Sequence, residues 1–215
     1  MKRNSIMITL LLVIVLLTGC NQQMDIEKRN YVMGLGIDLK DGQFVFSFSF
    51  PDLTALIGKG ENIHYPVVNI EAGSLEEAAV VYARQSNRRL DYGQLQSIVI
   101  GRDLIMNKEK MEQVLNEIKE NREFSRTILA CMADENAYDI IKLDETVNGS
   151  IGIYIRDMFE NNLQQLPHEN ITVGDLIIGL SNPEKEIRIP TAAVDETGII
   201  PKIIGYEVIQ GVSLQ

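Results

Sequence analysis

The chain has 215 residues, of which 45% are apolar and 23% charged, which suits one domain with a buried core. Its formal net charge of −10 argues against a nucleic-acid partner, because lysine and arginine are the residues that bind phosphate backbones. Only two cysteines and two histidines are present, without a zinc-ligand spacing, so we expect no metal and no cofactor.

Residues 1–19 have the layout of a signal peptide. Lys2 and Arg3 form a positive head, and the apolar run 6–17 is too short to span a bilayer, which takes roughly 20 residues. The run leads into Leu17-Thr18-Gly19-Cys20, which resembles the bacterial lipobox, where the cysteine receives a diacylglyceryl group before cleavage. We therefore expect Cys20 to be the lipidated first residue of the mature chain. The alternative is an ordinary signal followed by a free or buried cysteine.

Residues 20–30 read as a polar spacer from the membrane, and three strands are predicted after it, over 31–38, 44–50 and 64–72. The dipeptide Asp41-Gly42 is typical of a hairpin turn between the first two. Four phenylalanines at every second position, from 44 to 50, lie on one face of the second strand. We interpret this row as the core face of a half-buried sheet; the alternative is an aromatic platform for a ligand.

The middle of the chain alternates helices and strands. The helix after residue 74 begins with a capping box, Ser74 and Glu77, and carries Arg84, Arg88 and Arg89 near its end, where they complement the helix dipole. Cys131 falls in an apolar strand and is expected to be a small core residue. The remaining predictions are strands at 95–101, 126–133, 187–194 and 203–210, and helices at 108–121, 135–142, 150–165 and 172–182. This order favours an α+β fold, a mixed sheet with helices packed against it.

Motifs for catalysis are not found. Gly34-Leu35-Gly36 has Leu39 where a dinucleotide fingerprint needs its third glycine, and Gly58-Lys59-Gly60 lacks the serine or threonine of a phosphate loop. No G-x-S-x-G elbow is present, and nothing nominates a pair of catalytic carboxylates. The sequence therefore disfavours an enzyme.

Several segments resemble one known family. After the lipobox come MDIEKRNYVMGLGIDLKDGQFVFSFSFPDL, RQSNRRLDYGQLQSIVIGRDL, NGSIGIYIRDMFENN and ITVGDLIIGLSNPEKEIRIP, all in order. They are similar to the C-subunit lipoproteins of bacterial spore germination receptors, the Ger(x)C family. The most specific pieces are the strand Gly34-x-Gly36-Ile37-Asp38 and the stretch from Tyr92-Gly93 to Gly101. The family commonly has a histidine after the Tyr-Gly pair, where this chain has Gln94.

The resemblance implies a non-enzymatic receptor subunit required for nutrient-triggered germination. It would lie on the outer face of the spore inner membrane, held by Cys20, beside two integral membrane subunits. No catalytic residues are carried over. The implied division is a signal peptide (1–19), a spacer (20–30), an N-terminal α+β domain (31–200) and a stub of the next domain (201–215), so that the chain would be the truncated N-terminal domain of a multi-domain lipoprotein.

Two other classes remain as alternatives. A solute-binding lipoprotein of a membrane transporter would need two lobes with a cleft and a hinge, and the sequence has no repeated α/β half. An extracytoplasmic enzyme would need a polar constellation in a pocket. Genes for two membrane subunits beside this one would favour the receptor, whereas permease and ATPase genes would favour transport.

The lipidation hypothesis gives a direct prediction. Cys20→Ala removes the thiol that would accept the diacylglyceryl group, so the variant should take up no labelled fatty acid when expressed in a lipoprotein-processing bacterium. The measurement is fatty-acid labelling followed by gel fluorography, with Cys131→Ala as the control that keeps its label. Equal labelling of the wild type and Cys20→Ala would contradict the hypothesis.

Overall fold

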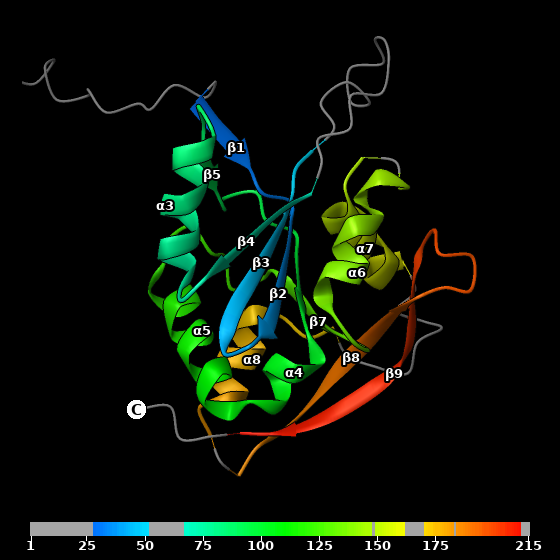
Figure 1. The fold of residues 1–215 in the computed structure, drawn as a ribbon. Coiled ribbons are helices and arrows are strands. Elements are labelled where there is room, and N and C mark those ends of the chain that lie inside the picture. The colour runs from blue at the N-terminus through cyan, green and yellow to red at the C-terminus, as the bar shows by residue number, and fades with distance from the viewer. Residues whose placement is uncertain (1–27, 52–66, 148, 162–169, 183, 212–215) are drawn as a thin grey trace, which may run out of the picture.

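The computed structural model describes residues 28–51, 67–147, 149–161, 170–182 and 184–211 (Figure 1). They form a mixed seven-stranded sheet with helices on both faces, which confirms the α+β class. β2, β6, β7 and β8 run parallel, β3 and β4 fold back beside β2, and β9 runs antiparallel to β8. In spatial order the strands are β4 (Val68–Ala72), β3 (Gln43–Ser49), β2 (Gly34–Lys40), β6 (Ser97–Ile100), β7 (Leu129–Ala133), β8 (Glu186–Val194) and β9 (Pro201–Gln210).

The helices divide between the two faces of this sheet, and each layer has its own apolar core (Figure 1). The first layer holds α3 (Leu75–Gln85), α4 (Arg102–Met106), α5 (Lys108–Glu120) and α8 (Val173–Leu180). The second layer holds α6 (Ala137–Ile141), the 3₁₀ helix η2 (Lys142–Glu145) and α7 (Ile151–Asn161). Among the described residues, no helix combines the length and the apolar character needed to cross a membrane.

The hairpin between β2 and β3 confirms two predictions. Asp41 and Gly42 both have positive φ, 51° and 81°, as the tight hairpin turn requires. The side chains of Phe44, Phe46 and Phe48 are fully buried in the first layer, so the aromatic row belongs to the core. The expected half-buried sheet is wrong, however. The alternate side of β3 is buried as well, because α6 and α7 cover its small serines.

Side chains cap the starts of both α8 and α3, and the capping box predicted at α3 differs in one contact. At α8, the Thr172 hydroxyl accepts the backbone N–H of Asp175, and the Asp175 carboxylate accepts that of Thr172, at 3.2 and 2.9 Å. At α3, the Ser74 hydroxyl accepts the N–H of Glu77, but the Glu77 carboxylate accepts the N–H of Gly73 instead of Ser74. The predicted box at α3 is thus displaced by one residue on its acidic side.

The predicted strand 31–38 covers the end of one strand, β1, and most of a second, β2, and these two strands belong to different sheets. β1 (Arg29–Tyr31) pairs in parallel with β5 (Arg89–Asp91), and the chain changes partners before β2 begins. Val32 N–H donates to the carbonyl of Asp91, whereas Met33 N–H donates to that of Ser49. Because the change of hydrogen-bond partner between Val32 and Met33 does not alter the apolar pattern of the segment, the sequence did not predict the break.

Two further strands differ in extent from their predictions. β4 begins at Val68, and residues 64–66 of the predicted strand lie outside the described residues. The segment 201–210, predicted to be mainly strand, is β9, and it pairs with β8 from Pro201 to Gln210 with one irregularity opposite Thr191/Ala192. It is an edge strand of the same seven-stranded sheet as β2 to β4 and β6 to β8.

The pattern Gly34-x-Gly36-x-Asp38 on β2 is explained by the packing of α6 and α7. A Cβ added at Gly36 would lie 2.8 Å from Ile141 Cγ1 of α6, and one at Gly34 would lie 3.2 Å from the backbone nitrogen of Gly152. Asp38 accepts the N–H groups of Ala137 and Tyr138, at 2.6 and 2.9 Å, at the start of α6. Burial raises the pKa of the Asp38 carboxyl, and these two N–H groups offset part of that rise.

This packing predicts a large difference between two glycines. A Cβ at Gly152 would lie 1.9 Å from the backbone oxygen of Met33, so Gly152→Ala should lower the free energy of unfolding by about 3 kcal/mol or more. Gly205, on β9, has nothing within 4 Å of an added Cβ, so Gly205→Ala should be neutral or stabilise by up to about 1 kcal/mol. Urea denaturation measures both, and equal midpoints would show that α7 does not pack on β2 as described.

Candidate functional site

The described chain starts at the end of the sheet where the parallel strands β2, β6 and β7 begin. We call this surface the proximal end, and it consists of β1, β5 and the segments that lead into β2 and β6 (Figure 1). Gln96, just before β6, holds its neighbours together: its N–H donates to the carbonyl of Met33, and its carbonyl accepts the N–H of Leu129. A tether attached before β1 would reach the domain at this end.

Five cationic side chains gather at the proximal end, and we call them the basic patch: Lys28, Arg29, Arg84, Arg88 and Arg89. The expectation that all of Arg84, Arg88 and Arg89 serve the helix dipole is only partly right. Arg84 lies in the last turn of α3, but the helix is capped at Ser86, and Arg89 opens β5. There it lies in register with Arg29 of β1.

The described contacts of the basic patch pair one cation with a carboxylate and another with a neutral amide. Arg29 forms an ion pair with the buried Asp91, at 2.6 Å between Nη1 and Oδ2. Arg88 donates to the side-chain oxygen of Asn30 at 3.1 Å, and this partner is neutral. Arg84 is exposed. Arg84 and Arg88 therefore place positive charge at this end of a chain whose overall charge is negative.

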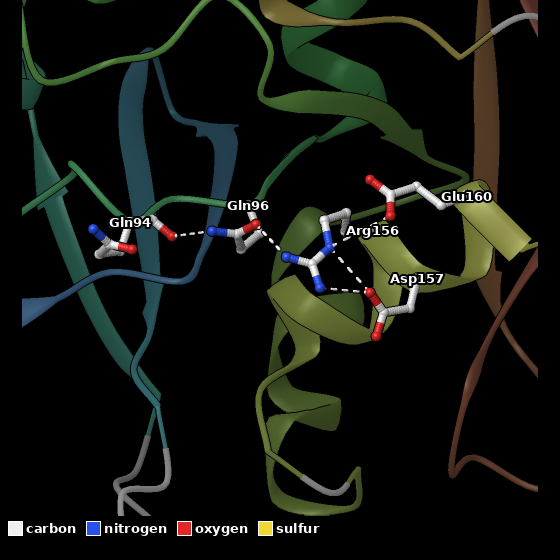
Figure 2. Close-up of polar contacts among 5 residues, drawn as sticks. All are labelled: Gln94, Gln96, Arg156, Asp157 and Glu160. Atoms are coloured by element: carbon white, nitrogen blue, oxygen red, sulfur yellow. Dashed lines mark hydrogen bonds and ion pairs between the residues drawn. The ribbon is translucent and has the colours of Figure 1, made fainter. Parts of the chain in front are cut away.

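A second polar group at the proximal end joins α7 to the segment before β6 (Figure 2). The side chain of Gln96 donates to the carbonyl of Gln94 at 2.7 Å and accepts from Arg156 Nη1 at 2.6 Å. Arg156 also donates twice to Asp157 Oδ1, at 3.0 and 2.6 Å, and lies 3.9 Å from a Glu160 oxygen. With acidic partners already on its guanidinium, Arg156 positions α7 and is a poor anion-binding group.

Buried polar side chains in the second layer form a cluster of a different kind. The Ser49 hydroxyl donates to Asp144 Oδ1 at 2.6 Å and lies 3.0 Å from the Ser150 hydroxyl. The same Asp144 oxygen accepts the N–H of Ile151 at 2.7 Å. All three side chains are at most 6% exposed, so no substrate reaches the serines. The cluster holds β3, η2 and the start of α7 together.

The remaining candidate residues divide between the core and the part of the chain that is not described. Cys131 is 1% exposed, which confirms it as a core residue, and burial raises the pKa of its thiol to about 12. Cys20, Gly58-Lys59-Gly60, His64 and His168 lie outside the described residues. Within the described ranges, no group of three or more His, Cys, Asp or Glu side chains is arranged to hold a metal ion.

One hollow, lined mostly by apolar side chains, lies between α5, α8 and β9, away from the proximal end. Its volume is about 230 Å³. Met106 and Val208 on its rim are 65% and 53% exposed. A wider hollow of about 780 Å³ surrounds Asp38 and Tyr138 at the other end of β2. The titratable side chains that line the two hollows are carboxylates, lysines and one tyrosine.

These features were not all accessible to sequence reasoning. The contact between Gln96 and Arg156 joins residues 60 positions apart, and that between Ser49 and Asp144 joins residues 95 apart. Neither pair has a local pattern that would mark it. The basic patch left a partial signal, the arginines at 84, 88 and 89, but only the pairing of β1 with β5 adds Lys28 and Arg29.

The fold and these contacts define an α+β domain whose buried polar groups hold its own elements together and whose proximal end carries exposed charge. The particular family follows from comparison with known sequences. The chain belongs to the family described as spore germination protein N-terminal domain, which matches residues 22–194 and confirms the resemblance. The chain therefore has a role in spore germination. No curated protein and no solved structure was found to match it.

Proposed function

We propose that this protein is a non-enzymatic, lipid-anchored subunit of a nutrient-sensing spore germination receptor. It is held by Cys20 at the outer face of the spore inner membrane and contacts two integral membrane subunits of that receptor there. The observation that carries the proposal is the family match over residues 22–194, which begins two residues after the lipobox cysteine.

The geometry supports action by contact at the membrane surface. Lys28, the first described residue, is eight residues from Cys20, a length that spans at most roughly 29 Å when fully extended. A domain tethered in this way stays near the headgroups, with its proximal end closest to the tether. Two acyl chains on one cysteine are enough for stable attachment, whereas one is marginal.

The contacts of the described polar groups also favour a role in binding partner proteins over a role in catalysis. The buried carboxylates Asp38 and Asp144 accept backbone N–H groups of α6 and α7, and the guanidinium of Arg156 is bound to Gln96 and Asp157. A catalytic group needs access to its substrate and a partner that activates it. These groups are engaged in holding helices to the sheet.

A solute-binding lipoprotein of a transporter is the alternative from the sequence. Such a protein closes two lobes around its ligand by a hinge. The described strands form one seven-stranded sheet and one two-stranded pair, and the seven-stranded sheet spans residues 34–210. This arrangement favours a single rigid body, and with it the receptor subunit.

The proposal is tested by co-purification from solubilised spore membranes. The tagged full chain should bring down two integral membrane germination subunits, and a strain without the gene should fail to germinate with the matching nutrient. Tagged Cys20→Ala is the matched control, and we expect at least a tenfold lower recovery of the two subunits, because the protein is no longer held at the membrane. Recovery of the tagged chain alone, together with normal germination of the deletion strain, would contradict the proposal.

A further inference from the structure

A third hollow lies in the first layer, between the N-terminal end of α3 and the C-terminal end of α5. Its volume is about 360 Å³, which is within the roughly 300–1,000 Å³ of ligand pockets. Three carboxylates line it, those of Glu76, Glu117 and Glu120, together with the apolar side chains of Leu75 and Ala79. Among the described residues that line it, none is a lysine, an arginine or a histidine. The hollow therefore offers negative charge beside apolar surface.

Tyr92 also lines this hollow, and its hydroxyl has no hydrogen-bond partner among the described residues. The residue is 5% exposed, and its backbone groups are engaged. Its N–H donates to Glu123 Oε2 at 3.1 Å, and its carbonyl accepts the N–H of Leu95 at 3.0 Å. Its ring stacks on that of Phe124, with the ring centroids 4.7 Å apart. Because buried hydroxyls in proteins nearly always bind a partner, this one is available to a polar group that enters the hollow.

The charge states of the lining groups define what that polar group is. Burial raises the pKa of the Tyr92 phenol, and the Glu123 carboxylate raises it further, so the hydroxyl stays protonated and neutral. Its oxygen can accept a hydrogen bond. The carboxylates of Glu76 and Glu120 are exposed and can only accept. A ligand group with a positive charge and several N–H donors is complementary to this set.

The helix ends beside the hollow also favour a cation. The C-terminal end of α5 carries the negative end of its helix dipole. The N–H groups at the positive end of α3 are already bound, because Leu75 N–H donates to Glu117 Oε2 at 2.6 Å. The N–H of Glu77 donates to the Ser74 hydroxyl at 3.0 Å. Since Glu117 is engaged in this way, a ligand's charge would meet the two exposed carboxylates instead.

A metal ion does not fit this set of groups. Within the described ranges, no three His, Cys, Asp or Glu side chains are arranged to hold one. We infer that the hollow binds a small organic amine in its ammonium form. The ammonium group donates to the Tyr92 hydroxyl in the field of the two exposed carboxylates, and the carbon chain lies against Leu75 and Ala79. This site is separate from the proposed contacts with the membrane and with the receptor subunits.

Isothermal titration calorimetry of the full chain in a neutral detergent tests the inference, in an amine-free phosphate buffer at about pH 7. The probes are butylammonium and 1-butanol, which is uncharged and has a carbon chain of the same length. Butylammonium should bind at least about tenfold more tightly, since a hydrogen bond to a charged group contributes roughly that factor or more. Magnesium chloride should give no heat of binding.

A single-atom change tests the hydroxyl. Tyr92→Phe keeps the ring and removes only the oxygen, so it should weaken butylammonium binding about tenfold. Its melting temperature should stay the same or rise, because a buried hydroxyl without a partner is lost. The matched control is Tyr138→Phe, in the wider hollow at the other end of β2, which should bind butylammonium within about twofold of the wild type.

A second pair of variants tests the carboxylates. Glu76→Gln/Glu120→Gln should weaken butylammonium binding about fivefold, the combined contribution of two exposed charges. The control Glu109→Gln/Glu184→Gln removes the same charge at exposed positions that do not line the hollow. It should bind within about twofold of the wild type, because distant surface charges are screened by salt.

Four results would overturn the inference: no heat of binding with butylammonium, equal affinity for 1-butanol, unchanged affinity in Tyr92→Phe, or tighter binding of magnesium than of butylammonium. Each can be obtained without a membrane and without the receptor subunits. Failure here therefore leaves the proposed attachment and the proposed partner contacts untouched, and failure of fatty-acid labelling or co-purification leaves the amine site untouched.

Discussion

The close packing of two helices on β2 is the constraint on which the rest of the structure depends. α6 and α7 approach this strand so closely that Gly36 and Gly152 have no room for a side chain and Gly34 has little, and Asp38 caps α6 from the same face of β2. With this layer in place, the strands β2, β3, β6 and β7 are buried on both faces. The phenylalanines of β3 fill one core, while its serines lie under the second layer.

The same packing determines which polar groups are available for function. The buried carboxylates and the Arg156 guanidinium hold helices to strands, so these groups are engaged within the domain. A rigid domain of this kind can transmit a contact without a moving part of its own. Its membership in a spore germination family is the basis of the proposed role, in which the chain contributes a contact and not a chemical step.

Local patterns predicted most of the elements. The alternation in β3, the Asp41-Gly42 turn and the helix predicted over 108–121 each depend on neighbours a few residues away, and all three are confirmed. The break between β1 and β2 was missed because it depends on β5, some 60 residues later. The family signature Gly34-x-Gly36-x-Asp38 was visible as a motif, but its meaning required the position of α6. Cys20 lies outside the described residues and stays a prediction.

The central claim is that this domain works by contact at its proximal end, and photo-crosslinking in intact spores tests it most directly. Gln94 is exposed at that end, and Gln43 is exposed at the opposite end of β2 and β3, so a crosslinking amino acid at each forms a matched pair. The account predicts crosslinks to integral membrane germination proteins from position 94 and not from position 43. Crosslinks from position 43 alone would contradict it, because the domain would then meet its partners with the other end.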